Sequence, residues 1–210
     1  MADRETTRVE AFSDGVFAIA VTLLVLEFRV PELTETVTPA SLLQALLALW
    51  PSLLAFVVSF LSILVMWVNH HGVFDLVRAA DSRFKFANGL LLLVVTFIPF
   101  PTAVLARHLN DCGAPTAAAL YCGTHVLLSL AYIALWRTAR VGRRLIKPNV
   151  PDEHLRKIDF AYAMGLVVYV IATMLSCWNA YVGLAICMSL WIVWTVLDYA
   201  PTTNAPGDPA

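Results

Sequence analysis

The sequence predicts an all-α membrane protein with six transmembrane helices. Of its 210 residues, 60% are hydrophobic and only 14% are charged, whereas an average soluble domain carries about 25% charged residues. Several apolar runs reach the roughly 20 residues that a helix needs to cross a bilayer core of about 30 Å. The composition and these runs together exclude an ordinary soluble domain.

Six helices are expected, at residues 10–28, 41–74, 84–107, 115–138, 158–178 and 181–199. The second is longer than one crossing requires, so its first turns are expected at the membrane interface, with a kink at Pro51. The Pro99-Phe100-Pro101 sequence predicts a break in the third helix. Asn179 leaves almost no loop between the last two helices, which predicts a tight antiparallel hairpin. Residues 1–200 form one transmembrane unit, and the tail 201–210 is expected to be disordered.

The placement of basic residues predicts that both termini are cytoplasmic. Twelve of the 14 Lys and Arg residues lie before the first helix, between the second and third, or between the fourth and fifth. These segments share one side of the membrane if six helices cross it, and Lys and Arg accumulate on the cytoplasmic side. Only Arg29 and Arg107 fall on the other side. We therefore expect a multi-pass protein of the plasma or inner cell membrane.

The first helix opens with a polar motif that is unusual at the start of a membrane helix. Residues 8–14 read Arg-Val-Glu-Ala-Phe-Ser-Asp, and an apolar run over residues 15–26 follows directly. An ionised carboxylate near hydrocarbon is costly and normally has a partner. Ser13 and Asp14 are therefore expected to pair with polar groups on the second and third helices. The candidates at similar depth are Asn69, His70 and His71, which follow Trp67, and Asn88.

The same motif resembles the signature of the transmembrane protein 175 family. The family's Arg-x-x-x-Phe-Ser-Asp pattern corresponds here to Arg8, Phe12, Ser13 and Asp14. Residues 22–31 and 67–71 are also similar to the family, so the resemblance covers the first third of the chain. It implies a potassium channel related to those of endosomes and lysosomes. It also implies a homotetramer, because the signature occurs once here, whereas animal members contain two copies of a six-helix unit.

A helical wheel of the first helix separates an apolar stripe from the polar motif. At about 100° per residue, Leu23 and Leu26 lie within about 40° of Ile19, whereas Asp14 lies about 140° away. In a homotetramer whose first helices line a central pore, the stripe would form three rings, a hydrophobic constriction roughly 10 Å long. The resemblance likewise implies that Ile19, five residues after the signature Asp, lies in the narrow part of the pore.

Each of these interpretations has an alternative. A stripe such as Ile19, Leu23 and Leu26 more commonly faces lipid or a neighbouring helix. Thr22 is a further candidate at the pore edge, and its alternative is a hydrogen bond to the backbone carbonyl four residues earlier. The polar network is either a brace that holds the pore helix or a set of general contacts between helices, worth about 1 kcal/mol each.

A hydrophobic constriction can gate by dewetting and favour the cation that loses water more readily, which is potassium rather than sodium. No Thr-Val-Gly-Tyr-Gly filter sequence is present, so we expect the selectivity to be modest. The predicted function is a potassium-selective cation channel, and the alternatives are a proton-conducting channel or a secondary cation transporter. Transporters usually contain internal repeats, and none is visible in the sequence.

Other classes of protein have little support in the sequence. No catalytic motif is recognisable, so an enzyme is not expected. Adjacent His70 and His71 point apart on a helix, and no metal site or cofactor is expected. The expected ions are permeant K⁺, with H⁺ or other monovalent cations as alternatives. The expected partners are three further subunits and the lipid bilayer, and no nucleic acid is expected.

Overall fold

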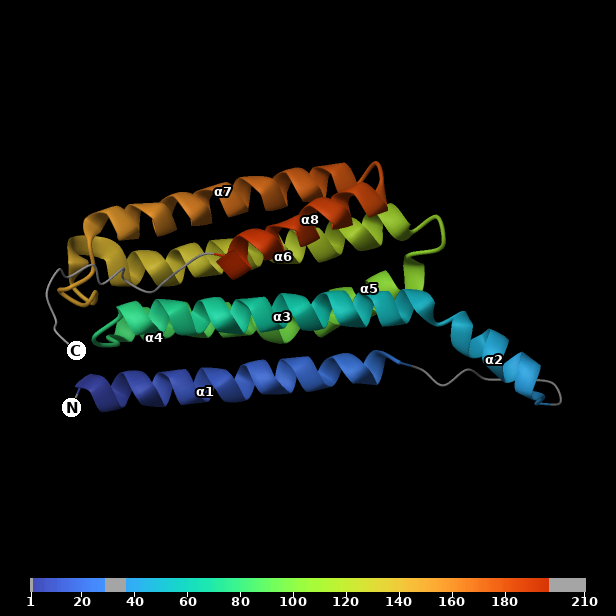
Figure 1. The fold of residues 1–210 in the computed structure, drawn as a ribbon, viewed down its shortest axis with the longest axis horizontal. Coiled ribbons are helices and arrows are strands. Elements are labelled where there is room, and N and C mark those ends of the chain that lie inside the picture. Colours follow the sequence, from blue (N-terminus) through green and yellow to red (C-terminus); the bar gives the residue numbers. More distant parts are fainter. Residues whose placement is uncertain (1, 29–36, 197–210) are drawn as a thin grey trace, which may run out of the picture.

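The computed structural model is a bundle of long helices that run side by side (Figure 1). It describes residues 2–28 and 37–196. The elements are α1 (Ala2–Leu23), η1 (Leu24–Glu27), α2 (Pro39–Leu47), α3 (Trp50–Leu76), α4 (Ser82–Phe97), α5 (Pro99–His108), α6 (Ala114–Arg140), η2 (Val141–Arg143), α7 (Asp152–Ser176) and α8 (Ala180–Val196).

Five helical segments in the described part of the chain are long and apolar enough to cross a membrane. They are Glu5–Glu27, Trp50–Leu76, Ser82–His108, Ala114–Arg143 and Asp152–Ser176. The sixth expected helix corresponds to α8, which is apolar but has only 17 residues within the described range. The protein is therefore an all-helical, multi-pass membrane protein. The predicted end of the sixth helix at 197–199 and the tail 201–210 lie outside the described residues.

The structure confirms the interruptions that the prolines predicted. The second apolar run divides into α2 and α3, and Pro51 occupies the first turn of α3, where its missing N–H costs no helical hydrogen bond. The third run divides at Ile98, immediately before Pro99. The last two long helices, α7 and α8, are joined through residues 177–179 as the predicted tight hairpin.

Two predicted helix starts were wrong. The first helix begins at Ala2 rather than at residue 10, because its polar first turns find partners: Thr6 is buried, and Glu5 pairs with Lys85 of α4. The fifth begins at Asp152 rather than at residue 158. Pro151 stands at its N-cap, and an acidic first turn suits the positive end of the helix dipole.

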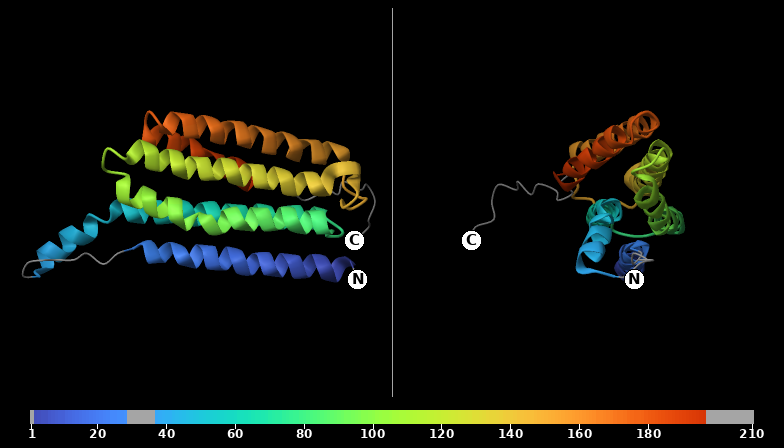
Figure 2. Two further views of the ribbon diagram at one scale, coloured as in Figure 1. Left: turned by 180° about the vertical axis from the view of Figure 1, so that it is seen from behind. Right: turned by 90° about the vertical axis from the view of Figure 1, so that its right-hand side faces the viewer.

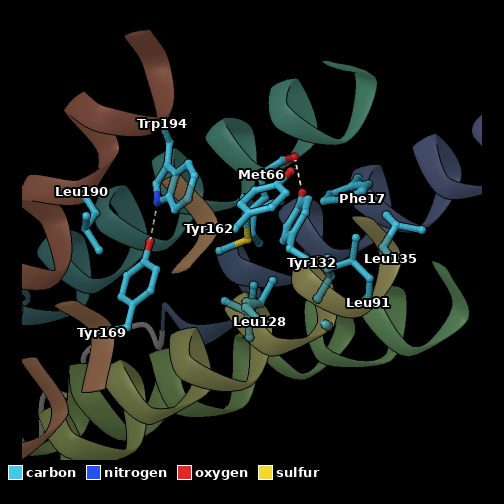
Figure 3. Packing of buried hydrophobic residues seen from close by; sticks show 14 of the residues in the cluster. Phe17, Met66, Leu91, Leu128, Tyr132, Leu135, Tyr162, Tyr169, Leu190 and Trp194 are labelled. Carbon is cyan, nitrogen blue, oxygen red and sulfur yellow. Dashed lines mark hydrogen bonds between the residues drawn. The ribbon is translucent and has the colours of Figure 1, made fainter. Parts of the chain in front are cut away.

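The α1 helix lies at the edge of the bundle. It packs against α3 and α4 and makes no comparable contact with α6, α7 or α8 within the described residues. The end-on view in Figure 2 shows the same peripheral position. Phe17 of α1 belongs to the buried core, part of which is drawn in Figure 3, and its ring packs against His70 of α3 with the ring centres 5.3 Å apart. One face of α1 thus packs against the other helices of the chain, and the opposite face is left uncovered.

The core between α3, α6, α7 and α8 is tied by buried polar contacts as well as apolar packing. The Tyr132 hydroxyl donates to the Met66 carbonyl at 2.5 Å, and the Trp194 indole donates to the Tyr169 hydroxyl at 3.1 Å (Figure 3). At Gly183, a Cβ atom would lie 1.9 Å from the Ser176 hydroxyl oxygen, so glycine is required for the close approach of α7 and α8.

The three basic segments predicted to be cytoplasmic lie at one end of the bundle (Figure 1). The α3–α4 and α6–α7 connections are joined there, since the Arg78 N–H donates to the Leu145 carbonyl at 2.9 Å. Asp81 caps α4 and pairs with Arg144. The hydrogen bond from the Phe84 N–H and the pairing with Arg144 outweigh the effect of burial, so the pKa of the Asp81 carboxyl lies below its usual value.

Candidate pore face and polar network of the first helix

The apolar stripe of α1 lies on the face that the rest of the chain leaves uncovered. Ile19 is 58% exposed and Leu26 is 70% exposed, whereas Phe17 and Leu24 on the opposite face are almost completely buried. Leu23 is also exposed. These three apolar side chains therefore do not contribute to the core of the chain, and they are free to face lipid, a second protein chain or a pore.

The end of α1 differs from the predicted α-helix but keeps the stripe aligned. Residues 24–27 form a three-ten turn, in which side chains three residues apart lie directly above one another. Leu26 therefore moves from its α-helical position to one above Leu23. The apolar stripe thus continues from the α-helix into the three-ten turn.

The remaining candidates on this face also have defined positions. Phe12 is 67% exposed, and Arg8 is exposed on the same helix, near Glu5. The Thr22 hydroxyl donates to the Ile19 carbonyl at 2.9 Å. This is the expected type of backbone hydrogen bond, but it reaches three residues back rather than four.

Ser13 joins α1 to α4 and α3 through a buried chain of hydrogen bonds. The Asn88 amide donates to the Ser13 hydroxyl at 2.9 Å, and that hydroxyl donates to the Val9 carbonyl at 2.9 Å. The Asn88 carbonyl oxygen lies 2.8 Å from His70 Nε2. Because that oxygen can only accept, Nε2 carries the proton. All three side chains are buried, so this chain fixes the rotation of α1 from inside the bundle.

Asp14 makes a second, more exposed connection to α3. The Trp67 indole donates to Asp14 Oδ1 at 2.9 Å, and His71 Nε2 lies 3.4 Å from the same oxygen. His71 Nδ1 lies 3.1 Å from the Trp67 carbonyl. His71 Nε2 also lies 3.7 Å from a carboxylate oxygen of Glu10. Asp14 is therefore held from α3 by the indole of Trp67, and the imidazole of His71 lies close to the same oxygen.

Asn69 was a candidate partner of Ser13 and Asp14, but its side-chain amide makes other contacts. Its amide donates to the Val65 carbonyl at 2.8 Å and to the Trp194 carbonyl at 3.2 Å, which ties α3 to α8. The sequence reasoning also missed two acidic residues of α1. Glu5 pairs with Lys85, and Glu10 could have been found because it lies one turn before Asp14 on the same face.

Comparisons with known proteins identify the family. Residues 8–99 match the family described as endosomal/lysosomal potassium channel TMEM175. A potassium channel of Chamaesiphon minutus is 45% identical over 198 residues, which are 93% of this chain and 96% of that channel. The chain belongs to the TMEM175 family. The resemblance seen in the motif at residues 8–14 is therefore confirmed.

A solved TMEM175 structure agrees in fold, and a sequence match extends the family to animals. The crystal structure of a lysosomal potassium-selective channel TMEM175 homolog from Chamaesiphon minutus aligns with a TM-score of 0.81 and 44% identity. It covers 91% of this chain and 97% of that one. The human endosomal/lysosomal proton channel TMEM175 is 36% identical over 152 residues, which are 68% of this chain and 30% of the human protein.

Proposed function

We propose that this TMEM175 protein is a homotetrameric cation channel with modest selectivity for potassium, and that its pore is lined by α1. The observation that carries the proposal is the uncovered apolar stripe on a helix at the edge of the subunit. Only side chains outside the core can surround an axis shared with other subunits. The bacterial relative that matches nearly the whole chain is named a potassium channel, which supports the choice of ion.

The proposed constriction consists of rings of Ile19, Leu23 and Leu26, with Thr22 at its edge. Four aliphatic side chains at each level offer no oxygen to replace the hydration shell of an ion. Passage then depends on wetting of the constriction, and the ion that loses water more readily passes more easily. Potassium is favoured over sodium on this basis, without a ring of backbone carbonyls.

The polar network on the other side of α1 acts as a brace in this proposal. Ser13 and Asp14 are held by α3 and α4, so the rotation of α1 about its own axis is fixed. Since the stripe lies on a different face of the same helix, the brace aims Ile19 at the axis without contacting ions. Loss of the brace should disturb assembly and opening more than selectivity.

Proton conduction is a second candidate function. The human member of the family is named a proton channel. A constriction that becomes transiently wet can transmit protons along water as well as potassium ions. Both activities would then use one pore, and they should respond together to substitutions in the stripe.

Flux measurements on purified protein in liposomes test the function. Gradients of potassium, sodium and protons should be imposed in turn on the same preparation, and the flux of each ion should be measured. We expect potassium flux to exceed sodium flux, and both to require the protein. Absence of potassium flux from a correctly assembled tetramer would contradict the proposal.

The proposal places six crossings in each subunit, with α8 as the sixth and both termini in the cytoplasm. Single cysteines placed within residues 32–38 should react with an impermeant thiol reagent from outside the cell. Cysteines within 145–155 should react only from inside. The background should lack the exposed native thiols of Cys112 and Cys177. The reverse labelling pattern would contradict the orientation.

A further inference from the structure

A groove runs between α1 and α3 on the outside of the subunit, beside the apolar stripe. Its volume is about 390 Å³, and its walls are Asp14, Phe17, Ala18, Val21, Phe60, Ile63, Leu64 and Trp67. Small-molecule sites commonly have volumes of about 300–1,000 Å³. The groove is therefore large enough for an organic ligand, and it is distinct from the stripe at Ile19.

One carboxylate lies in this otherwise apolar groove. Asp14 Oδ1 accepts the hydrogen bond from Trp67 and faces His71. No hydrogen-bond donor from the residues that the structure describes reaches Asp14 Oδ2. A carboxylate oxygen retains a strong preference for a cationic or hydrogen-bonding partner in a medium of low polarity. This end of the groove is thus suited to a positively charged group.

Aromatic and aliphatic side chains form the rest of the groove. The indole of Trp67 lies at the same end as Asp14 and directs its N–H at Asp14 Oδ1. Away from the carboxylate, Phe60 and Leu64 are both more than one third exposed and offer apolar surface. Asp14 and Val21 are seven residues apart, which corresponds to about 10 Å along α1. The groove therefore combines one anionic end with an apolar trough of that length.

We propose that this groove binds an amphiphilic ammonium ion, a protonated amine that carries an aliphatic chain. The ammonium group lies beside Asp14 and Trp67, and the chain lies against Phe60 and Leu64. Charge complementarity selects the amine over a neutral amphiphile of the same length. The site goes beyond ion conduction, since the ligand contacts the outer flank of α1 rather than the stripe that would face the pore.

Binding of octylammonium to the full-length protein in nanodiscs tests the proposal. Isothermal titration, corrected with empty nanodiscs, should give a dissociation constant about tenfold lower for octylammonium than for octanol. Leu64→Trp fills the trough and should weaken octylammonium binding about tenfold. Leu61→Trp is the matched control, because Leu61 is similarly exposed one turn away but does not line the groove. It should bind as the wild type does.

A second groove-filling variant, Ala18→Leu on α1, should weaken octylammonium binding in the same way as Leu64→Trp. It keeps the test decisive if the Leu64→Trp protein does not fold. Equal affinities for octylammonium and octanol would overturn the proposal. Equal effects of Leu64→Trp and Leu61→Trp would also overturn it. So would the absence of binding to the wild type, the result expected if a neighbouring subunit fills the groove. Because binding is measured directly, the result does not depend on whether the protein conducts potassium.

Discussion

Ile19→Asn should raise ion flux and reduce the discrimination between potassium and sodium. An amide in the proposed Ile19 ring would hold water in the constriction, so that ions could pass with more of their hydration shell. A barrier lower by about 1.4 kcal/mol would raise the flux about tenfold. Fluxes of both ions should be measured in liposomes that contain equal amounts of assembled protein.

Leu24→Asn, in η1 directly after α1, is the control for a polar residue placed in the first membrane-spanning segment. Leu24 is completely buried within the chain, in contrast to Ile19. An unpaired amide at this position should cost about 1–3 kcal/mol and lower the yield of assembled protein. The selectivity of the protein that does assemble should not change. Wild-type flux and selectivity in an assembled Ile19→Asn protein would refute the hydrophobic pore and place the conduction path elsewhere in the helices.

Hydropathy predicted the helices well and their ends poorly, for a physical reason. An apolar run identifies the residues that are buried in the membrane, so the helices were predicted correctly. The prolines within the runs predicted where the helices are interrupted. The first turns of α1 from Ala2 and of α7 from Asp152 are polar, and hydropathy does not detect them. The three-ten turn at residues 24–27 packs against α3 and α5, and no local pattern reports contacts between segments so far apart in the sequence.

The depth in the bundle at which Ser13 and Asp14 find their partners was predictable, but the direction in which each candidate side chain points was not. The requirement that Ser13 and Asp14 be paired selected a set of residues at the same level of the bundle. Adjacent residues on a helix differ in direction by about 100°, so His70 faces Asn88 and α1 whereas Asn69 faces α8. Only the rotation of α3 decides which residue joins the network, and the sequence does not specify that rotation.

Asn88 is the residue on which the buried part of the network depends. It is the only described side chain that bonds both Ser13 and His70, and it is 2% exposed. Nδ1 of His70 is already buried without a hydrogen-bond partner among the described residues. Without Asn88, neither ring nitrogen of His70 would be paired, and α1 would lose its buried connection to α4.

Asn88→Leu should therefore destabilise the protein by about 1–3 kcal/mol, the usual cost of leaving buried polar groups unpaired, and lower the fraction that assembles. Thermal unfolding and size-exclusion chromatography of the purified protein measure both effects. Phe86→Leu on the same helix is the control and should change neither, since Phe86 is 82% exposed. The ratio of potassium to sodium flux should stay at the wild-type value in assembled Asn88→Leu protein, because Asn88 contacts the side of α1 away from the stripe. An unchanged unfolding temperature would show that the network is not a brace, and an altered flux ratio with normal assembly would place it in the conduction path.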